Sequence, residues 1–198
     1  DRFCSGLLFW YHNCPVRQVC ARMWDWSLEP TASLYHTANS LEPLHAQFDY
    51  LKNTVSVVND FYQDFKAYTV TAQVYDINSK LVFEESAKVD LPSDGVANDV
   101  LTIRFPENIS QVHFIKLRLK DEKNKEVSSN FYWRSNDKYE GKETLTGPTS
   151  SGFEALSQLK QAKLKTSYKI RKTEDKYFVD VTVRNISNSI AFFNQLQF

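Results

Sequence analysis

The sequence lacks an excess of charge of either sign and lacks any long apolar run. Its 198 residues include 24 basic and 24 acidic side chains, so the formal net charge at pH 7 is zero. Such a balance argues against a nucleic acid or an anionic membrane surface as the main partner. No stretch approaches the roughly 18 uncharged apolar residues of a membrane-spanning helix. We therefore expect no nucleic-acid partner and no membrane partner.

Cysteine and glycine are also scarce. The three cysteines, Cys4, Cys14 and Cys20, all fall within the first 20 residues, and an odd, clustered set does not build a disulfide framework. A metal site from Cys14, Cys20 and His12 would lack the short thiol spacing of structural zinc and a fourth ligand. The five glycines form no phosphate-binding loop. We predict free thiols in a packed segment, no metal site and no cofactor.

The composition and the first segment are those of a folded protein. Apolar residues make up 42% of the chain and charged residues only 24%, which is enough for a packed interior. The apolar run at residues 5–11 predicts a strand buried on both faces. At residues 31–44 apolar side chains recur every three or four positions, which predicts a helix. Strand and helix make one βα unit over residues 1–45, and such a unit needs neighbours.

From residue 46 to residue 135 the pattern is β throughout. Short runs rich in β-branched and aromatic residues mostly alternate in polarity, and turn signals separate them. Seven such strands in about 90 residues match the strand number of an immunoglobulin-like sandwich. The predicted strands cover residues 55–58, 68–75, 81–83, 87–91, 100–105, 113–119 and 129–133.

A second β region follows a linker. Residues 136–160 are mostly polar, with Gly and Pro residues that are typical of a linker. Residues 161–198 contain three alternating runs, and three strands are fewer than a sandwich needs. We interpret this region as the beginning of a second β-sandwich, truncated, because a chain that stops on an apolar strand would leave a sticky edge. The three runs are residues 162–170, 177–183 and 190–198.

The chain shows no self-sufficient catalytic set. Hydrolytic glycosidases need two carboxyl groups that face each other across a cleft. Asp25 and Glu29 are the only carboxylates in the predicted βα loop, and a structural role is favoured over catalysis for both. Cys14 beside His12 has no third group to orient it. We therefore predict no catalytic residue within this chain.

Aromatic side chains crowd the first segment and offer another chemistry. Flat apolar faces with polar rims suit sugar rings, which present C–H faces for stacking. Trp10 lies at the carboxyl end of the predicted strand, where barrel enzymes place functional side chains. For Trp10, sugar binding and plain packing stay open as alternatives. For Trp24 and Trp26 packing is favoured, because indoles most often serve as large packing units.

Several motifs occur in a fixed order along nearly the whole chain, and together they resemble a known family. They are Gly-Leu-Leu-Phe-Trp-Tyr-His-Asn at 6–13, Met-Trp-Asp-Trp-Ser-Leu-Glu-Pro at 23–30, the segment from Ala32 to Tyr35, Leu-Glu-Pro-Leu-His at 41–45 with Gln47, Asn-Phe-Tyr-Trp-Arg-Ser at 130–135, Leu156 with Leu159, Asn185 with Ser187, and Ile-Ala-Phe-Phe-Asn-Gln-Leu-Gln at 190–197. The sequence thus resembles glycoside hydrolase family 2, in the branch that holds exo-β-D-glucosaminidases and mannosylglycoprotein endo-β-mannosidases.

The resemblance implies a fold and a parent enzyme. The fold would be mainly β: an immunoglobulin-like β-sandwich (46–135), preceded by the terminal βα unit of a (β/α)8 catalytic barrel (1–45) and followed by the start of a second sandwich (161–198). The parent would be a retaining β-glycosidase that hydrolyses β-linked glucosamine or mannose. This chain would support the barrel, and by itself it would be inactive. A periplasmic, secreted or lysosome-like setting would suit such a substrate.

The resemblance also implies roles for particular residues. The general acid and the nucleophile of the family lie on earlier barrel strands, before residue 1. Trp10 matches the tryptophan that forms the floor of the sugar subsite, and Asn13 matches the asparagine that follows it. Relatives commonly carry a second tryptophan soon after this asparagine, whereas this sequence has Cys14, Pro15 and Val16. That departure leaves the substrate open. We expect Trp10 and Asn13 to bind a β-linked amino-sugar or mannose-containing glycan, and the rest of the glycosidase to be the partner.

A different class of function stays open. The sandwich could be a non-catalytic module that binds carbohydrate or another protein, which an exposed row of aromatic side chains would favour. Phe61, Tyr62 and Phe65 form the one cluster of this kind that the pattern picks out, and core packing is the favoured interpretation of it. A spacer without a ligand is the third alternative.

Overall fold

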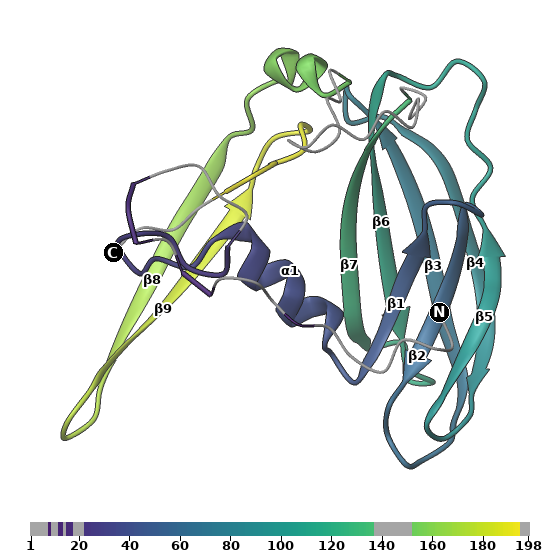
Figure 1. Cartoon of the computed structure of the whole chain (residues 1–198), viewed down its shortest axis with the longest axis horizontal. Helices are drawn as coiled ribbons and strands as arrows, with labels where there is room; N and C mark the ends of the chain where they lie inside the picture. The colour runs from purple at the N-terminus through teal and green to yellow at the C-terminus, as the bar shows by residue number, and fades with distance from the viewer. Residues whose placement is uncertain (1–7, 9–11, 14, 18–21, 137–151, 195–198) are drawn as a thin grey trace. The chain divides into compact units, whose positions relative to one another are not determined.

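The computed structural model describes residues 8, 12–13, 15–17, 22–136 and 152–194 (Figure 1). In this part of the chain, nine strands accompany one α-helix and one 3-10 helix. No helix among these residues is both long enough and apolar enough to cross a membrane. The protein is mainly β, as the sequence predicts.

The helix α1 (Ala32–Ser40) lies within the predicted range and ends earlier than expected. Leu41 follows it with φ −99° and ψ 4°, outside a regular helix. The reason is Pro43, because a proline disfavours helical backbone at the residue before it. No residue of α1 is buried, and Leu41 is 73% exposed. The strand predicted for residues 5–11 lies outside the described residues except for Leu8, so the βα unit stays a prediction.

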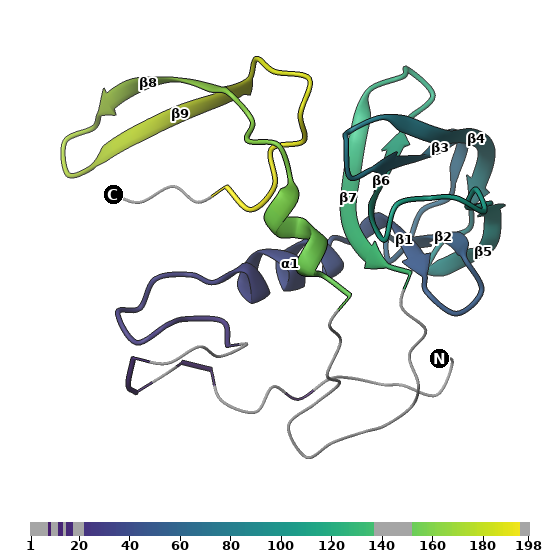
Figure 2. The same cartoon turned by 90° about the horizontal axis from the view of Figure 1, so that it is seen from above.

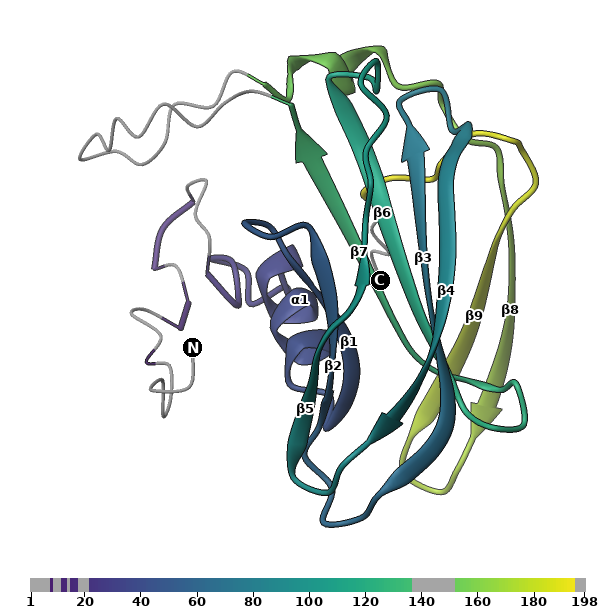
Figure 3. The same ribbon diagram turned by 90° about the vertical axis from the view of Figure 1, so that its right-hand side faces the viewer.

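Seven strands of the described chain form two sheets that enclose a core (Figure 2). One sheet is antiparallel and has the order β1-β2-β5, with Leu44 of β1 opposite Asn59 of β2. The other has the order β4-β3-β6-β7 (Figure 3). The predicted immunoglobulin-like sandwich is thereby confirmed. The strand bounds are β1 Leu44–Asp49, β2 Thr54–Asn59, β3 Phe65–Asp76, β4 Leu81–Leu91, β5 Gly95–Thr102, β6 Val112–Lys120 and β7 Glu126–Ser135.

The core follows from alternation in the strand sequences. Every second side chain of β3 is buried from Tyr68 to Val74. The strand β6 is buried on both faces at its beginning, where His113 and Phe114 are both fully covered. Each fully buried valine or leucine contributes about 1.5–3 kcal/mol relative to an exposed one. The core is therefore built mainly by the two central strands of the four-stranded sheet.

Some predicted strand boundaries are wrong. The runs at 81–83 and 87–91 belong to one strand, β4, because the polar residues between them lie on a sheet edge that tolerates exposure. The sequence pattern predicts no strand at β1, whose first two residues fall in the predicted βα unit, yet β1 pairs with β2 over its whole length. The predicted number of seven is correct only because these two errors cancel.

The strand β5 is displaced from the predicted residues 100–105. Its pairing with β2 shifts between Val55 and Val57, whose partners are Leu101 and Ala97. The residues between these partners form a bulge, and Asp99 within it has φ 51°. A β-bulge inserts extra residues and bends the strand. The pattern did not reveal it because polar residues interrupt the alternation there.

The described residues pack as two compact units. One consists of residues within 1–71, 86–102 and 117–130, and the other of residues within 72–85, 103–116 and 131–198. The first contains α1 and the three-stranded sheet, and the second contains the C-terminal β region.

In the described residues up to 194, the C-terminal region forms a hairpin rather than three strands. The strands β8 (Leu164–Lys172) and β9 (Tyr177–Asn185) pair antiparallel, and the 3-10 helix η1 (Glu154–Gln158) precedes them. The third predicted strand, at 190–198, is wrong for residues 190–194, which are irregular. Its remaining residues lie outside the described part of the chain.

Candidate functional site

Of the two predicted substrate-binding residues, the structure places one. Trp10 lies outside the described residues. Asn13 is exposed and forms a parallel bridge with Trp24. Its backbone carbonyl accepts a hydrogen bond of 2.9 Å from the Arg22 guanidinium. The rings of His12 and Trp24 lie 6.2 Å apart. Asn13 is therefore held next to one of the aromatic residues of the first segment, with its side chain accessible.

A tight turn follows and uses the carboxylate that the sequence singled out. Asp25 accepts hydrogen bonds from the Ser27 amide and hydroxyl, both at 2.8 Å, and from the Glu29 amide at 2.9 Å. The Ser27 hydroxyl is the main cause of a lowered pKa at Asp25, and the two amides add to it. A carboxylate that hydrogen bonds of a turn keep ionised is a poor general acid. This geometry favours the structural role for Asp25.

The turn presents one tryptophan to solvent. Trp26 is 52% exposed, whereas Met23 before it is buried. Leu28 closes the turn with φ 64°, and its amide donates to the Asp25 carbonyl at 3.2 Å. The indole of Trp26, for which packing is predicted, is thus only about half covered by the described residues.

The cluster of Phe61, Tyr62 and Phe65 is partly packed and partly exposed. The rings of Phe61 and Phe65 lie 5.9 Å apart, and Phe65 lies 5.3 Å from the Tyr68 ring. Tyr62, in contrast, is 88% exposed. The favoured prediction of core packing is wrong for Tyr62 and for Phe61, which is 43% exposed, while Phe65 is half-buried between neighbouring rings. The buried side chain of Asn59 holds this loop, because its amide donates at 2.8 Å to two backbone carbonyls.

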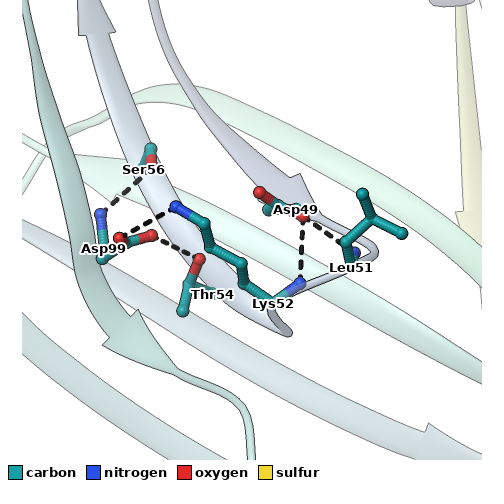
Figure 4. A network of polar contacts seen from close by, with 6 residues as sticks. All are labelled: Asp49, Leu51, Lys52, Thr54, Ser56 and Asp99. Atoms are coloured by element: carbon teal, nitrogen blue, oxygen red, sulfur yellow. Dashed lines mark hydrogen bonds and ion pairs between the residues drawn. The ribbon is translucent and has the colours of Figure 1, made fainter. Parts of the chain in front are cut away.

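A polar network joins the β1–β2 turn to the bulge of β5 (Figure 4). Asp99 accepts hydrogen bonds from the Thr54 hydroxyl at 2.6 Å and from the Lys52 ammonium at 3.3 Å. These two donors, Thr54 first, lower the pKa of Asp99. The Asp99 amide donates to the Ser56 hydroxyl at 3.1 Å. The network orders the bulge, and sequence reasoning missed it because its partners lie more than 40 positions apart.

His113 is the most perturbed titratable group among the described residues. It is 1% exposed, and neither ring nitrogen has a hydrogen-bond partner. Burial is the main cause that lowers the pKa of His113 to about 4, and the positive charge of Arg134 adds to this. Its ring packs 5.0 Å from that of Phe105. It is a neutral core histidine rather than a catalytic base, because it faces the interior of the sandwich.

An aromatic surface lies on the opposite face of β6 and β7. Phe114 and Phe131 stack at 5.7 Å, and Phe192 contacts Phe114 at 5.4 Å and Trp133 at 5.4 Å. A row of aromatic rings on a sandwich face could have bound a sugar, but here a later segment of the same chain covers it. The sequence did not indicate this contact.

The structure offers no metal centre in the residues that it describes, since no three His, Cys, Asp or Glu side chains gather there. The three cysteines of the first segment lie outside those residues.

Comparison with known proteins identifies relatives of this architecture. Residues 52–139 match the family model of the mannosidase Ig/CBM-like domain. An exo-β-D-glucosaminidase of Amycolatopsis orientalis is 24% identical over 132 residues, which are 66% of this chain and 13% of the relative. One of Arthroderma benhamiae is 25% identical over 203 residues, which are 97% of this chain and 22% of the relative. The chain thus spans less than a quarter of the length of these relatives.

A solved structure shows the same fold. The Amycolatopsis orientalis exo-chitosanase matches with a TM-score of 0.79 at 22% identity, over 93% of this chain and 23% of that chain. A variant of that enzyme has been solved in complex with PNP-β-D-glucosamine.

Proposed function

We propose that this chain is a supporting part of a larger retaining β-glycosidase. Its residues 52–139 belong to the mannosidase Ig/CBM-like domains of glycoside hydrolase family 2, in the exo-β-D-glucosaminidase and mannosidase branch. The observation that carries the proposal is the similarity to an exo-β-D-glucosaminidase along 97% of the chain. The enzyme would hydrolyse β-linked glucosamine or mannose through a covalent glycosyl intermediate.

The exposed face of α1 supports a barrel role for residues 1–45. Tyr35 and Leu41 are 59% and 73% exposed, and no residue of the helix is buried. In a (β/α)8 barrel the outer helices bury their apolar stripe against strands and neighbouring helices. We assign residues 1–45 to the last strand and helix of such a barrel, whose remaining strands would cover these side chains.

The β8–β9 hairpin supports a second β-sandwich. Cross-strand pairs place Tyr168 with Val181 and Ile170 with Val179 on one face, and Lys169 with Asp180 on the other. The apolar face is uncovered in the described chain, since Tyr168 is 70% and Ile170 59% exposed. Because an isolated two-stranded sheet is marginally stable in water, this face calls for further strands. Residues 161–198 would begin a sandwich, after a linker at 136–160.

The sugar contacts are assigned to Trp10 and Asn13. The indole would stack on the C–H face of a pyranose ring, and the asparagine amide would hydrogen-bond its hydroxyl groups. The exposed position of Asn13 beside Trp24 supports this assignment. The general acid and the nucleophile would come from other barrel strands, which agrees with the use of Asp25 by a turn.

The test is hydrolysis of chromogenic β-glucosaminide and β-mannoside substrates by the full-length protein. We expect turnover of one of the two sugars, at least a hundredfold loss of kcat/KM in Trp10→Ala, and a smaller loss in Asn13→Ala. Trp26→Ala is the matched control, since it removes an exposed indole of the same segment. Equal effects of Trp10→Ala and Trp26→Ala would contradict the subsite, and an inert parent protein would contradict the enzyme.

A non-catalytic binding module is the second candidate, favoured by one observation. Tyr62 is 88% exposed on a loop that the buried Asn59 holds in place, and a rigid exposed ring can stack on a sugar or a partner side chain. Retention of a polysaccharide by this chain, lost in Tyr62→Ala, together with absence of glycosidase activity in the full-length protein, would favour this function over the first.

A further inference from the structure

The outer face of the four-stranded sheet carries an aromatic patch, which consists of Phe114, Phe131 and Trp133. Phe114 and Phe131 stack with their planes 22° apart. The rings of the patch come from neighbouring strands, β6 and β7. An uncovered surface of this kind would favour association with a partner, because apolar area gains about 25 cal/mol per Å² on burial.

A segment after the β8–β9 hairpin covers this patch. The Phe192 ring lies 5.4 Å from Phe114, 6.5 Å from Phe131 and 5.4 Å from Trp133. Phe193 adds an edge contact of 5.8 Å to Trp133. The two contacts with Trp133 are edge-to-face, and such pairs add favourable energy beyond the buried area. One side chain, Phe192, therefore contacts all three members of the patch.

The backbone of the segment is anchored beside its rings. The Ile190 amide donates a 2.7 Å hydrogen bond to the Ser79 hydroxyl, which lies in the β3–β4 turn. Phe193, which is 67% exposed, has φ 55°, a left-handed conformation that is uncommon for an aromatic residue. The segment is thus held by a backbone hydrogen bond at Ile190 and by the ring contacts of Phe192.

The base of the hairpin links this anchor to both of its strands. Asn185, the last residue of β9, donates through its amide to the Ser189 carbonyl at 2.6 Å. The Ile186 amide donates to the Lys163 carbonyl, just before β8, at 2.9 Å. The Lys163 amide in turn donates to the Ser187 hydroxyl at 3.0 Å. Hydrogen bonds to the last residue of β9 and to the residue just before β8 therefore order the residues between β9 and the segment.

We propose that the aromatic patch is a docking surface for the chain's own segment from Ile190 to Phe193, and that this contact fastens the β8–β9 hairpin to the sandwich. The patch is consequently closed to glycans and to other proteins. The hairpin, in which no residue is buried, keeps its structure only while Phe192 is docked. This inference is independent of the glycosidase activity, because its test measures structure and not turnover.

The test is hydrogen exchange of the unmodified chain, Phe192→Ala and a matched control. Phe178→Ala is the control, because it removes a phenylalanine from β9 that lies on the polar face of the hairpin. In Phe192→Ala we expect the amides of Ile190 and of β8 and β9 to exchange at least tenfold faster, while those of β1 and β2 stay unchanged. In Phe178→Ala the Ile190 amide should keep its protection. Equal exchange of Ile190 and the hairpin in the unmodified chain and in Phe192→Ala would overturn the proposal.

A second variant decides the question if Phe192→Ala does not fold. Ser79→Gly removes the hydroxyl that accepts the Ile190 amide, and glycine suits the φ of 68° at this position. We expect faster exchange at Ile190 with the sandwich unaltered. An Ile190 amide that is unprotected already in the unmodified chain would also overturn the docking.

Discussion

The buried His113 should make this chain less stable as the pH falls below neutrality. In the folded chain its pKa is about 4, against an ordinary value of 6.5. The folded state therefore keeps the imidazole neutral over a range in which the unfolded chain binds a proton. Stability is complete above pH 6.5 and is lost progressively as the pH falls from 6.5 toward 4.

The size of the effect follows from the two pKa values. A difference of two and a half units corresponds to about 3 kcal/mol when the loss is complete, at 1.36 kcal/mol per unit. At pH 5 the unfolded chain is mostly protonated at this residue and the folded chain is not, so about 2 kcal/mol is already lost. For a chain of this size that loss lowers the Tm by roughly 4–8 °C.

The assay is thermal unfolding, followed by circular dichroism, between pH 7.5 and pH 5. His113→Leu fills the site with an apolar side chain and removes the titration, so its Tm should change much less over this range. His36→Gln, at an exposed position of α1, should keep the slope of the unmodified protein. The reasoning is refuted if His113→Leu shows the same pH dependence as the unmodified protein.

Two further predictions concern the loops next to β2 and β5. Asn59→Ala leaves the carbonyls of Gln63 and Pro92 without their 2.8 Å donors, so the free energy of unfolding measured in urea should fall by about 2 kcal/mol. The control Gln47→Ala, at an exposed position, should leave this free energy almost unchanged. Similar urea midpoints for the two variants would contradict the prediction. Gly95→Ala would bring a Cβ within 2.9 Å of the Pro92 ring. Because the proline ring is rigid, we expect the free energy of unfolding to fall by about 1–3 kcal/mol. An unchanged urea midpoint would disprove this.

The strands that sequence analysis placed correctly are those with a covered face. In β3 apolar residues alternate regularly, and in β6 they do so from Ile115 onward, so the pattern fixes both strands. In β4 the polar residues at its middle lie on an exposed sheet edge, where burial imposes no alternation. In β5 the bulge at Asp99 breaks the period. Local pattern thus predicts central strands and fails where exposure or a bulge removes the period.

The features beyond the sandwich depend on contacts between distant residues. The Asp99 network joins residues more than 40 positions apart, and the contact between Phe192 and Phe114 joins residues that lie even further apart in sequence. Residues 190–194 alternate like a strand, but their rings pack on another sheet and their backbone does not pair. The pattern indicates that such side chains must be buried, and only the fold shows against what. Trp10 stays a prediction, because it lies outside the described residues.

The central claim is that this chain belongs to a retaining glycosidase, and the anomeric form of the first product tests it most directly. The full-length protein should be incubated with a β-glucosaminide and with a β-mannoside while proton NMR follows the released sugar. We predict that the β-anomer appears first and then mutarotates, because a covalent intermediate gives net retention. Initial release of the α-anomer, or no hydrolysis of either substrate, would contradict the account.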